Sequence, residues 1–102
     1  MKENANKNGM KKKVKKLYMF EDGGHAWCRV RRAEKLFQSV AHLISGFSYQ
    51  YGQNVYLEED CDLGEYYKAI VAKGYEIEWV YKHTKNGEPS KIRGYQSYKY
   101  QA

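Results

Sequence analysis

The chain has 102 residues, of which 42% are apolar and 29% are charged, enough for one modest core but not for two. No run approaches the roughly 18 apolar residues that a membrane-spanning helix needs, so a membrane partner is not expected. The formal net charge of +6 is uneven, because residues 1–16 carry +6 and residues 82–102 carry +4, while residues 17–81 carry −4.

Two features predict that the protein works in the cytoplasm of the cell that makes it. No apolar core or small-residue cleavage site follows the lysine-rich start, which argues against a secretory signal. The chain has only two cysteines, Cys28 and Cys61, and an intracellular chain normally keeps such thiols reduced.

The first predicted unit is a hairpin followed by a short helix. Residues 14–20 contain β-favouring residues and end at the turn signal EDGG, after which residues 25–30 form the partner strand. Residues 31–37 combine good helix formers with apolar residues at helical spacing, which predicts a short amphipathic helix. Residues 40–44 extend this helix or form a second turn.

A second hairpin, a longer helix and another strand follow. Residues 47–51 alternate aromatic and polar side chains, and residues 55–57 resume the extended pattern after a turn that contains Gly52. Residues 63–74 have apolar side chains at helical spacing and end at a glycine, with Asp62 placed to cap the helix. Residues 75–81 alternate as a half-buried strand does.

The element order β-β-α-β-β-α-β, with a final short strand or tail, predicts an α+β fold. We expect a small antiparallel sheet with two helices packed on one face. Residues 14–102 would form this single domain and end in a basic, tyrosine-rich strand or tail, while residues 1–13 would form a basic flexible arm.

Four carboxylates lie within five positions after the second hairpin, and we call them the acidic cluster: Glu58, Glu59, Asp60 and Asp62. They could start the helix, with Asp60 or Asp62 as its cap and the others favoured by its dipole. They could instead form a partner-binding patch that meets a basic surface. A Mg²⁺ or Ca²⁺ site is a weaker alternative, because the glycine and distal glutamate of an EF-hand loop are missing.

The cysteine and histidine pattern predicts neither a zinc site nor catalysis. The chain has four potential zinc ligands, namely His25, Cys28, Cys61 and His83. They lack the paired spacing of a zinc motif. A cysteine nucleophile with His42 or His83 as its base has no supporting local signature, and phosphate-binding and hydrolase motifs are absent from the sequence. We therefore expect a protein that is not an enzyme and has no metal or cofactor.

Basic and tyrosine residues gather towards both ends of the chain, which contains eleven tyrosines. Lysine and arginine side chains neutralise phosphates, and tyrosine rings stack on bases. The predicted nucleic-acid-binding residues are Lys11, Lys12, Lys13, Lys15, Lys16, Lys91, Arg93, Tyr95, Tyr98 and Lys99. Two plainer interpretations stay open, namely that the termini are solubilising appendages and that the last segment is an edge strand with one wet face.

Several blocks of the sequence occur in a recognisable order: GGHAWCRV, RAE, ISGFSYQYG, VYLEEDCD, HT and SKIRGYQSY. In these blocks the chain resembles a group of small uncharacterised proteins and related domains found on phages, plasmids and other mobile elements. The resemblance covers about residues 17–98, and SYQYGQNVYLEEDCD is its most specific part. It implies a mobile-element protein acting in a bacterial host, and it transfers no residue-level function.

That context favours a non-catalytic counter-defence inhibitor, similar in size to anti-CRISPR proteins. Such an inhibitor would bind a host defence nuclease, or its ribonucleoprotein complex with guide and target, and block its activity. The alternative is a small basic accessory protein that binds DNA or RNA for a phage or plasmid. Exposed strand edges would also permit a homodimer.

Overall fold

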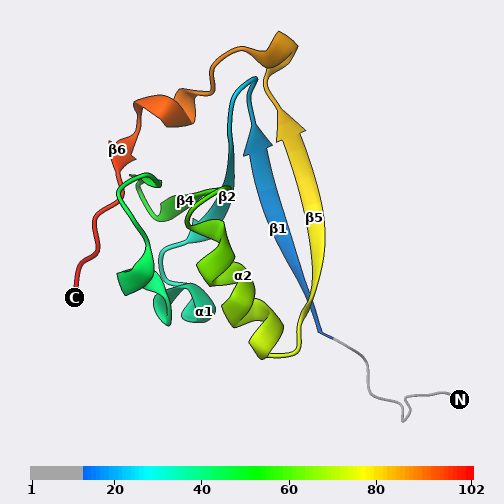
Figure 1. Ribbon diagram of the computed structural model, residues 1–102, viewed down its shortest axis with the longest axis vertical. Helices are drawn as coiled ribbons and strands as arrows, with labels where there is room; N and C mark the ends of the chain where they lie inside the picture. The colour runs from blue at the N-terminus through cyan, green and yellow to red at the C-terminus, as the bar shows by residue number, and fades with distance from the viewer. Residues whose placement is uncertain (1–12) are drawn as a thin grey trace, which may run out of the picture.

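The computed structural model describes residues 13–102, and within them one mixed sheet carries two α-helices (Figure 1). The sheet order is β5-β1-β2-β4-β3-β6. The strands are β1 (Val14–Glu21), β2 (Ala26–Arg31), β3 (Tyr49–Tyr51), β4 (Asn54–Glu58), β5 (Glu76–His83) and β6 (Gln96–Ser97). The helices are α1 (Lys35–Gln38) and α2 (Leu63–Ala72), with 3₁₀ turns η1 (Ala41–Leu43), η2 (Lys85–Gly87) and η3 (Lys91–Gly94). The predicted arm at residues 1–13 lies outside the described residues except for Lys13.

The α+β class agrees with the sequence, while the element order and the sheet differ from the prediction. The C-terminal segment, for which a short strand or a tail was expected, adds a sixth strand, β6, because Gln96 and Ser97 pair with β3. The sheet is therefore larger than expected, and it is mixed because β5 runs parallel to β1. The reason is topological: α2 carries the chain from β4 to the far side of β1, and a strand that arrives by such a crossover can run parallel to its neighbour.

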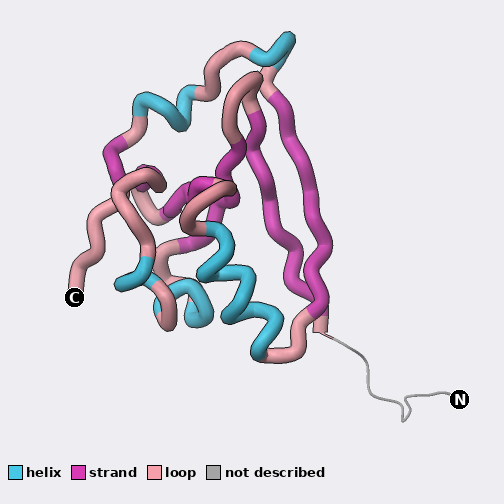
Figure 2. Tube along the Cα trace, viewed as in Figure 1, coloured by secondary structure: helices cyan, strands magenta, loops and turns pink. Residues whose placement is uncertain are grey.

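Alternation along the strands gives the sheet two different faces. On one face, Leu17, Met19 and Cys28 join Leu57 in the main core, which Phe37 of α1 and three residues of α2 complete. Figure 2 shows both helices beside the strands that they cover. The side chains between these positions point the other way, where a smaller cluster forms from Trp27, Tyr56 and Ile92. Neither α-helix contributes to that second cluster.

We call the surface on that second side the open face. Its side chains include Lys16, Tyr18 and Phe20 of β1, Arg29 and Arg31 of β2, Tyr56 of β4, Tyr49 and Tyr51 of β3, and Lys91 and Tyr95 of the C-terminal segment.

Candidate nucleic-acid interface

An arginine lies over two aromatic rings in the middle of the open face. The guanidinium carbon of Arg29 is 5.4 Å from the ring centroid of Tyr18 and 5.0 Å from that of Phe20. All three side chains are partly exposed, and the register sets Tyr18 opposite Arg29 on adjacent strands. The two rings therefore hold a cation at the surface in a fixed position.

A second aromatic group continues this surface towards β3. Tyr51 and Tyr95 are stacked, with ring centroids 4.5 Å apart and an interplanar angle of 12°. The ring centroid of Tyr95 is also 5.3 Å from that of Tyr56. Tyr51 is 62% exposed, so one side of the stack is accessible to a ligand. Burial and the neighbouring Tyr95 raise the pKa of Tyr56, which keeps that phenol neutral.

The charges of the open face are mainly positive. Lys16, Arg31 and Lys91 are exposed beside the aromatic rings. Arg31 also donates a hydrogen bond to the Gln53 side chain. On the outermost strand, the register adds Glu76, Glu78 and Lys82 to the same side. It also places Glu58 of β4 there, opposite Trp27, but that carboxylate is mostly buried. The exposed carboxylates on the strands of this face therefore lie on β5.

A cleft of about 430 Å³ lies between β1 and β2. These strands pair only from the Tyr18–Arg29 pair onward, so the first half of β1 pairs with β5 alone. The lining combines open-face side chains with Glu34 and Tyr66 from the helical side. Glu34 accepts a hydrogen bond from the Tyr66 hydroxyl at 2.7 Å and pairs with Lys15 at 3.4 Å, so its charge is already compensated.

The carboxylate of Glu34 also explains where helix α1 begins. It accepts hydrogen bonds from the backbone N–H groups of Leu36 and Phe37, each at 3.0 Å, as an N-cap residue does. Burial opposes the ionisation of Glu34, but the Tyr66 hydroxyl, these two N–H groups and Lys15 outweigh it and lower the carboxyl pKa.

The predicted nucleic-acid-binding residues fall into separate groups. Lys16, Lys91 and Tyr95 lie on the open face, and Lys99 is exposed near the C-terminus. Lys13 and Lys15 lie instead near the ring of Tyr75. Lys11 and Lys12 lie outside the described residues. The sheet thus brings together only part of the predicted set.

Tyr98 and Arg93 have structural roles that their sequence context did not reveal. Tyr98 is 7% exposed, and its hydroxyl donates to the Ala41 carbonyl at 3.1 Å. Its ring therefore belongs to the core and is not available for stacking on a base. Arg93 makes two hydrogen bonds to Asp22, at 2.6 and 2.9 Å, while its guanidinium carbon lies 5.4 Å from the Trp27 ring centroid.

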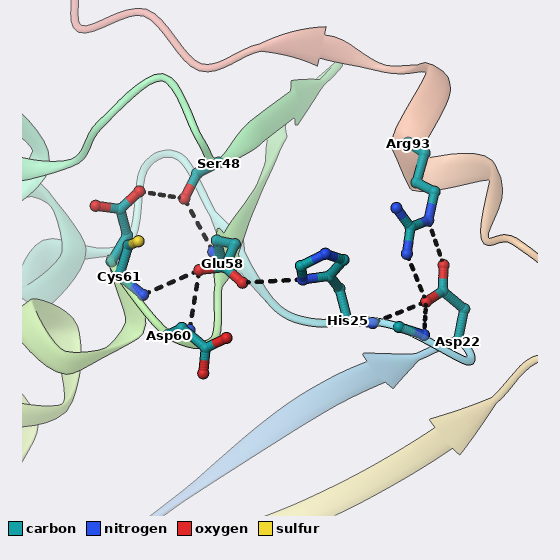
Figure 3. A network of polar contacts seen from close by, with 9 residues as sticks. Asp22, His25, Ser48, Glu58, Asp60, Cys61 and Arg93 are labelled. Atoms are coloured by element: carbon teal, nitrogen blue, oxygen red, sulfur yellow. Dashed lines mark hydrogen bonds and ion pairs between the residues drawn. The ribbon is translucent and has the colours of Figure 1, made fainter.

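Asp22 is the centre of the contacts that hold the C-terminal segment (Figure 3). Its carboxylate is 1% exposed, and it accepts backbone hydrogen bonds from Gly24, His25 and Ser90, each at 2.9 Å. Arg93 and these N–H groups outweigh the effect of burial and hold the pKa of Asp22 well below its usual range. The β1–β2 turn is thereby fixed to the segment that packs over Trp27.

Two members of the acidic cluster also have internal partners. Asp62 is 3% exposed and accepts hydrogen bonds from Ser45 N, Ser45 Oγ and Ser48 Oγ at 3.0, 2.8 and 2.6 Å. It occupies the predicted cap position of α2, but its side chain makes no capping hydrogen bond there. Glu58 accepts from the N–H groups of Asp60 and Cys61, both at 2.9 Å (Figure 3). Glu59 and Asp60 remain exposed.

The pairing of β2 with β4 brings His25 to the acidic cluster. His25 Nδ1 lies 3.5 Å from Glu58 Oε2, and one ligand atom each from His25, Glu58 and Asp60 lies within 4.8 Å of the others. An imidazole with two carboxylates is a donor set that suits a divalent ion. The four cysteines and histidines weighed for zinc do not gather, because Cys28 is buried in the main core and His83 pairs with Glu21 at 2.9 Å.

The same region forms a pocket of about 290 Å³ that mixes aromatic and acidic groups. Phe47, which is 72% exposed, and Tyr49 provide ring surface. Glu58 and Asp60 provide negative charge, while Arg93, which also lines the pocket, is already paired with Asp22. This combination suits a cationic side chain, because a ring face and a carboxylate both attract one.

Comparison with protein-family models, with curated proteins and with solved structures finds no match for this chain. None of the helices in residues 13–102 has the length and apolar character that crossing a membrane requires.

The most informative residues of the open face were missed in the sequence, namely Tyr18, Arg29, Arg31, Tyr51 and Tyr56. A signal for them was present, because Lys16, Tyr18 and Phe20 alternate with the apolar Leu17 and Met19. In a strand such residues share the face opposite the core. The strand prediction rested on β-favouring residues and the turn signal after them, which do not indicate what each face presents.

Proposed function

We propose that this protein binds single-stranded nucleic acid across the open face of its sheet. The observation that carries the proposal is the arrangement of Arg29 over Tyr18 and Phe20 beside the stacked pair Tyr51 and Tyr95. Exposed rings offer stacking surfaces for unpaired bases, and interleaved cations neutralise the phosphates between them. The role is that of a small nucleic-acid-binding accessory protein.

Single strands suit this surface better than a duplex does. The bases of a duplex are stacked on one another, so their ring faces are not accessible to Tyr51 or Tyr95. A duplex would contact the positive side chains through phosphates alone. We therefore expect the aromatic rings to favour unpaired bases, with little dependence on sequence.

The test is fluorescence anisotropy of the full chain with labelled single-stranded DNA, single-stranded RNA and a duplex of the same sequence. We expect tighter binding to the single strands and a logarithmic affinity that falls by about 0.7 per decade of salt for each neutralised phosphate. Tighter binding to the duplex, or no binding to single strands at low salt, would contradict the proposal.

A second candidate function is inhibition of a host defence nuclease or its ribonucleoprotein complex. The pocket lined by Phe47, Tyr49, Glu58 and Asp60 favours it, because a partner's lysine or arginine fits such a lining. Inhibition of this kind needs a docking surface and no reacting group.

We expect Phe47→Ala and Asp60→Asn to weaken inhibition of a target nuclease, while Glu59→Gln serves as the matched control. Glu59 is the exposed neighbouring carboxylate that does not line the pocket. Nuclease activity measured against inhibitor concentration would report the change. Equal losses from Glu59→Gln and Asp60→Asn would show that general negative charge, and not this pocket, is responsible.

A further inference from the structure

Strand β5 forms one margin of the sheet and is long for an edge strand. It has eight residues and pairs with β1 along one side (Figure 1), and within residues 13–102 no strand covers its other side. Glu76 N donates to Lys13 and Thr84 N donates to Glu21. The backbone N–H and C=O groups of successive residues point to opposite edges of a strand. Those of Ile77, Trp79 and Tyr81 therefore point away from β1, towards the free edge. An unpaired edge of this length is a template for another strand.

Exposed apolar side chains lie beside this edge on the helical side of the sheet. Tyr81 is 52% exposed, and Tyr67 and Val71 of α2 are 45% and 48% exposed. Trp79 stacks on Tyr67, with ring centroids 6.5 Å apart and an interplanar angle of 13°. An apolar patch at a free edge favours a partner that covers both the backbone and the rings.

The order of charges along β5 identifies the partner that fits. The strand reads EIEWVYKH, with glutamates at its start and basic residues at its end. An antiparallel copy of the same strand therefore sets acidic positions against basic ones. We propose that β5 pairs with β5 of a second copy of this chain, which gives a two-fold symmetric dimer with one continuous sheet.

The register of this pairing follows from the faces of the strand. Residues directly opposite in an antiparallel pair share a face, so a two-fold axis must pass through a residue position. An axis at Val80 sets Glu78 against the partner's Lys82 and Trp79 against the partner's Tyr81. An axis at Trp79 would instead set Glu78 against the partner's Val80. The first register sets opposite charges together on one face and two aromatic side chains together on the other, and it is the one we assign.

The opposite margin of the sheet explains why the assembly would stop at two chains. Strand β6 has only two residues, so it offers few backbone groups for further pairing. The dimer would also join the open faces of the two copies through their β5 strands. Dimer formation itself does not depend on the proposed nucleic-acid binding, and it is tested without nucleic acid.

Analytical ultracentrifugation of the full chain over a range of concentrations tests the dimer. We expect the parent protein to reach twice the 12.0 kDa mass of one chain. Lys82→Glu should weaken the dimer by about tenfold, because both glutamate–lysine pairs become repulsive. The double variant Glu78→Lys with Lys82→Glu should restore it. Lys99→Glu, which makes the same charge change away from β5, is the matched control.

Three results would overturn the proposal: a parent protein that stays monomeric at its highest soluble concentration, a dimer unaffected by Lys82→Glu, and an equal effect of Lys99→Glu. The double variant brings a second lysine beside Lys16, so thermal melts accompany each measurement. If the double variant fails to fold, Tyr81→Lys tests the register instead. This change places a positive charge opposite the partner's Trp79. A dimer that survives Tyr81→Lys contradicts the assigned register.

Discussion

Replacing Asp22 with alanine is expected to destabilise the protein by about 3 kcal/mol, because the change removes a carboxylate that Arg93 and three backbone N–H groups share. The loss falls on the contact between the β1–β2 turn and the C-terminal segment. Trp27 lies beneath Arg93 and packs with Ile92, so it should become more exposed. Urea denaturation gives the stability change, and a red shift of tryptophan emission reports the exposure.

Asp22→Asn is the matched control, since it keeps the shape and one acceptor oxygen but loses the negative charge. We expect a smaller loss, because the turn bonds from Gly24 and His25 can persist while the Arg93 pair weakens. Equal stability of the alanine variant and the parent protein would contradict a central role for this residue. An asparagine variant as unstable as the alanine variant would assign the whole effect to the charge.

The same carboxylate predicts how stability changes in acid. Because the folded pKa of Asp22 lies below the unfolded value of 3.8, its contribution is fully present well above that pH. It is lost as the pH falls through the range from about 5 downward, where the unfolded chain binds the proton more readily. The free energies of unfolding of the parent protein and of Asp22→Asn, measured by urea denaturation at a series of pH values, should therefore converge at low pH and differ near neutrality.

The sequence could predict the local elements because their signals are local. Alternating residues and the glycine at position 52, which has φ of +58°, mark the hairpins. Helical spacing marks α2. The parallel pairing of β5 with β1 had no such signal, because it joins segments about 60 residues apart along the chain and depends on where α2 carries the chain. The two-residue β6 is too short for alternation to decide between a strand and a tail.

Charge in the sequence was a poorer guide to the site, for a physical reason. A carboxylate's role depends on the donors that the fold brings to it, and those of Asp62 come from Ser45 and Ser48. Likewise Arg93 meets Asp22 across 71 positions. The acidic cluster looked like one surface, but half of it is internal. The cations of the open face looked dispersed, but two adjacent strands bring them together.

Tyr51→Ala is expected to weaken binding of single-stranded nucleic acid by about 1–3 kcal/mol, the usual value of one base stacked on an aromatic ring. Tyr51 is largely exposed and contributes to no core cluster, so stability should change little. Because the change removes no charge, the salt dependence of binding should stay the same. Tyr100→Ala is its matched control, since Tyr100 is 48% exposed and lies against His42, away from the open face.

Arg31→Ala should act differently, since it removes one exposed cation of the open face. We expect weaker binding together with a salt slope reduced by about 0.7, the contribution of one phosphate on a single strand. Lys68→Ala, on the exposed side of α2 where Lys68 pairs with Glu65 at 3.4 Å, removes the same charge from the helical side and should leave the slope unchanged. Anisotropy titrations at several salt concentrations separate the two effects. If Tyr100→Ala and Lys68→Ala weaken binding as much as the open-face variants do, nucleic acid binds by general charge and not across this face of the sheet.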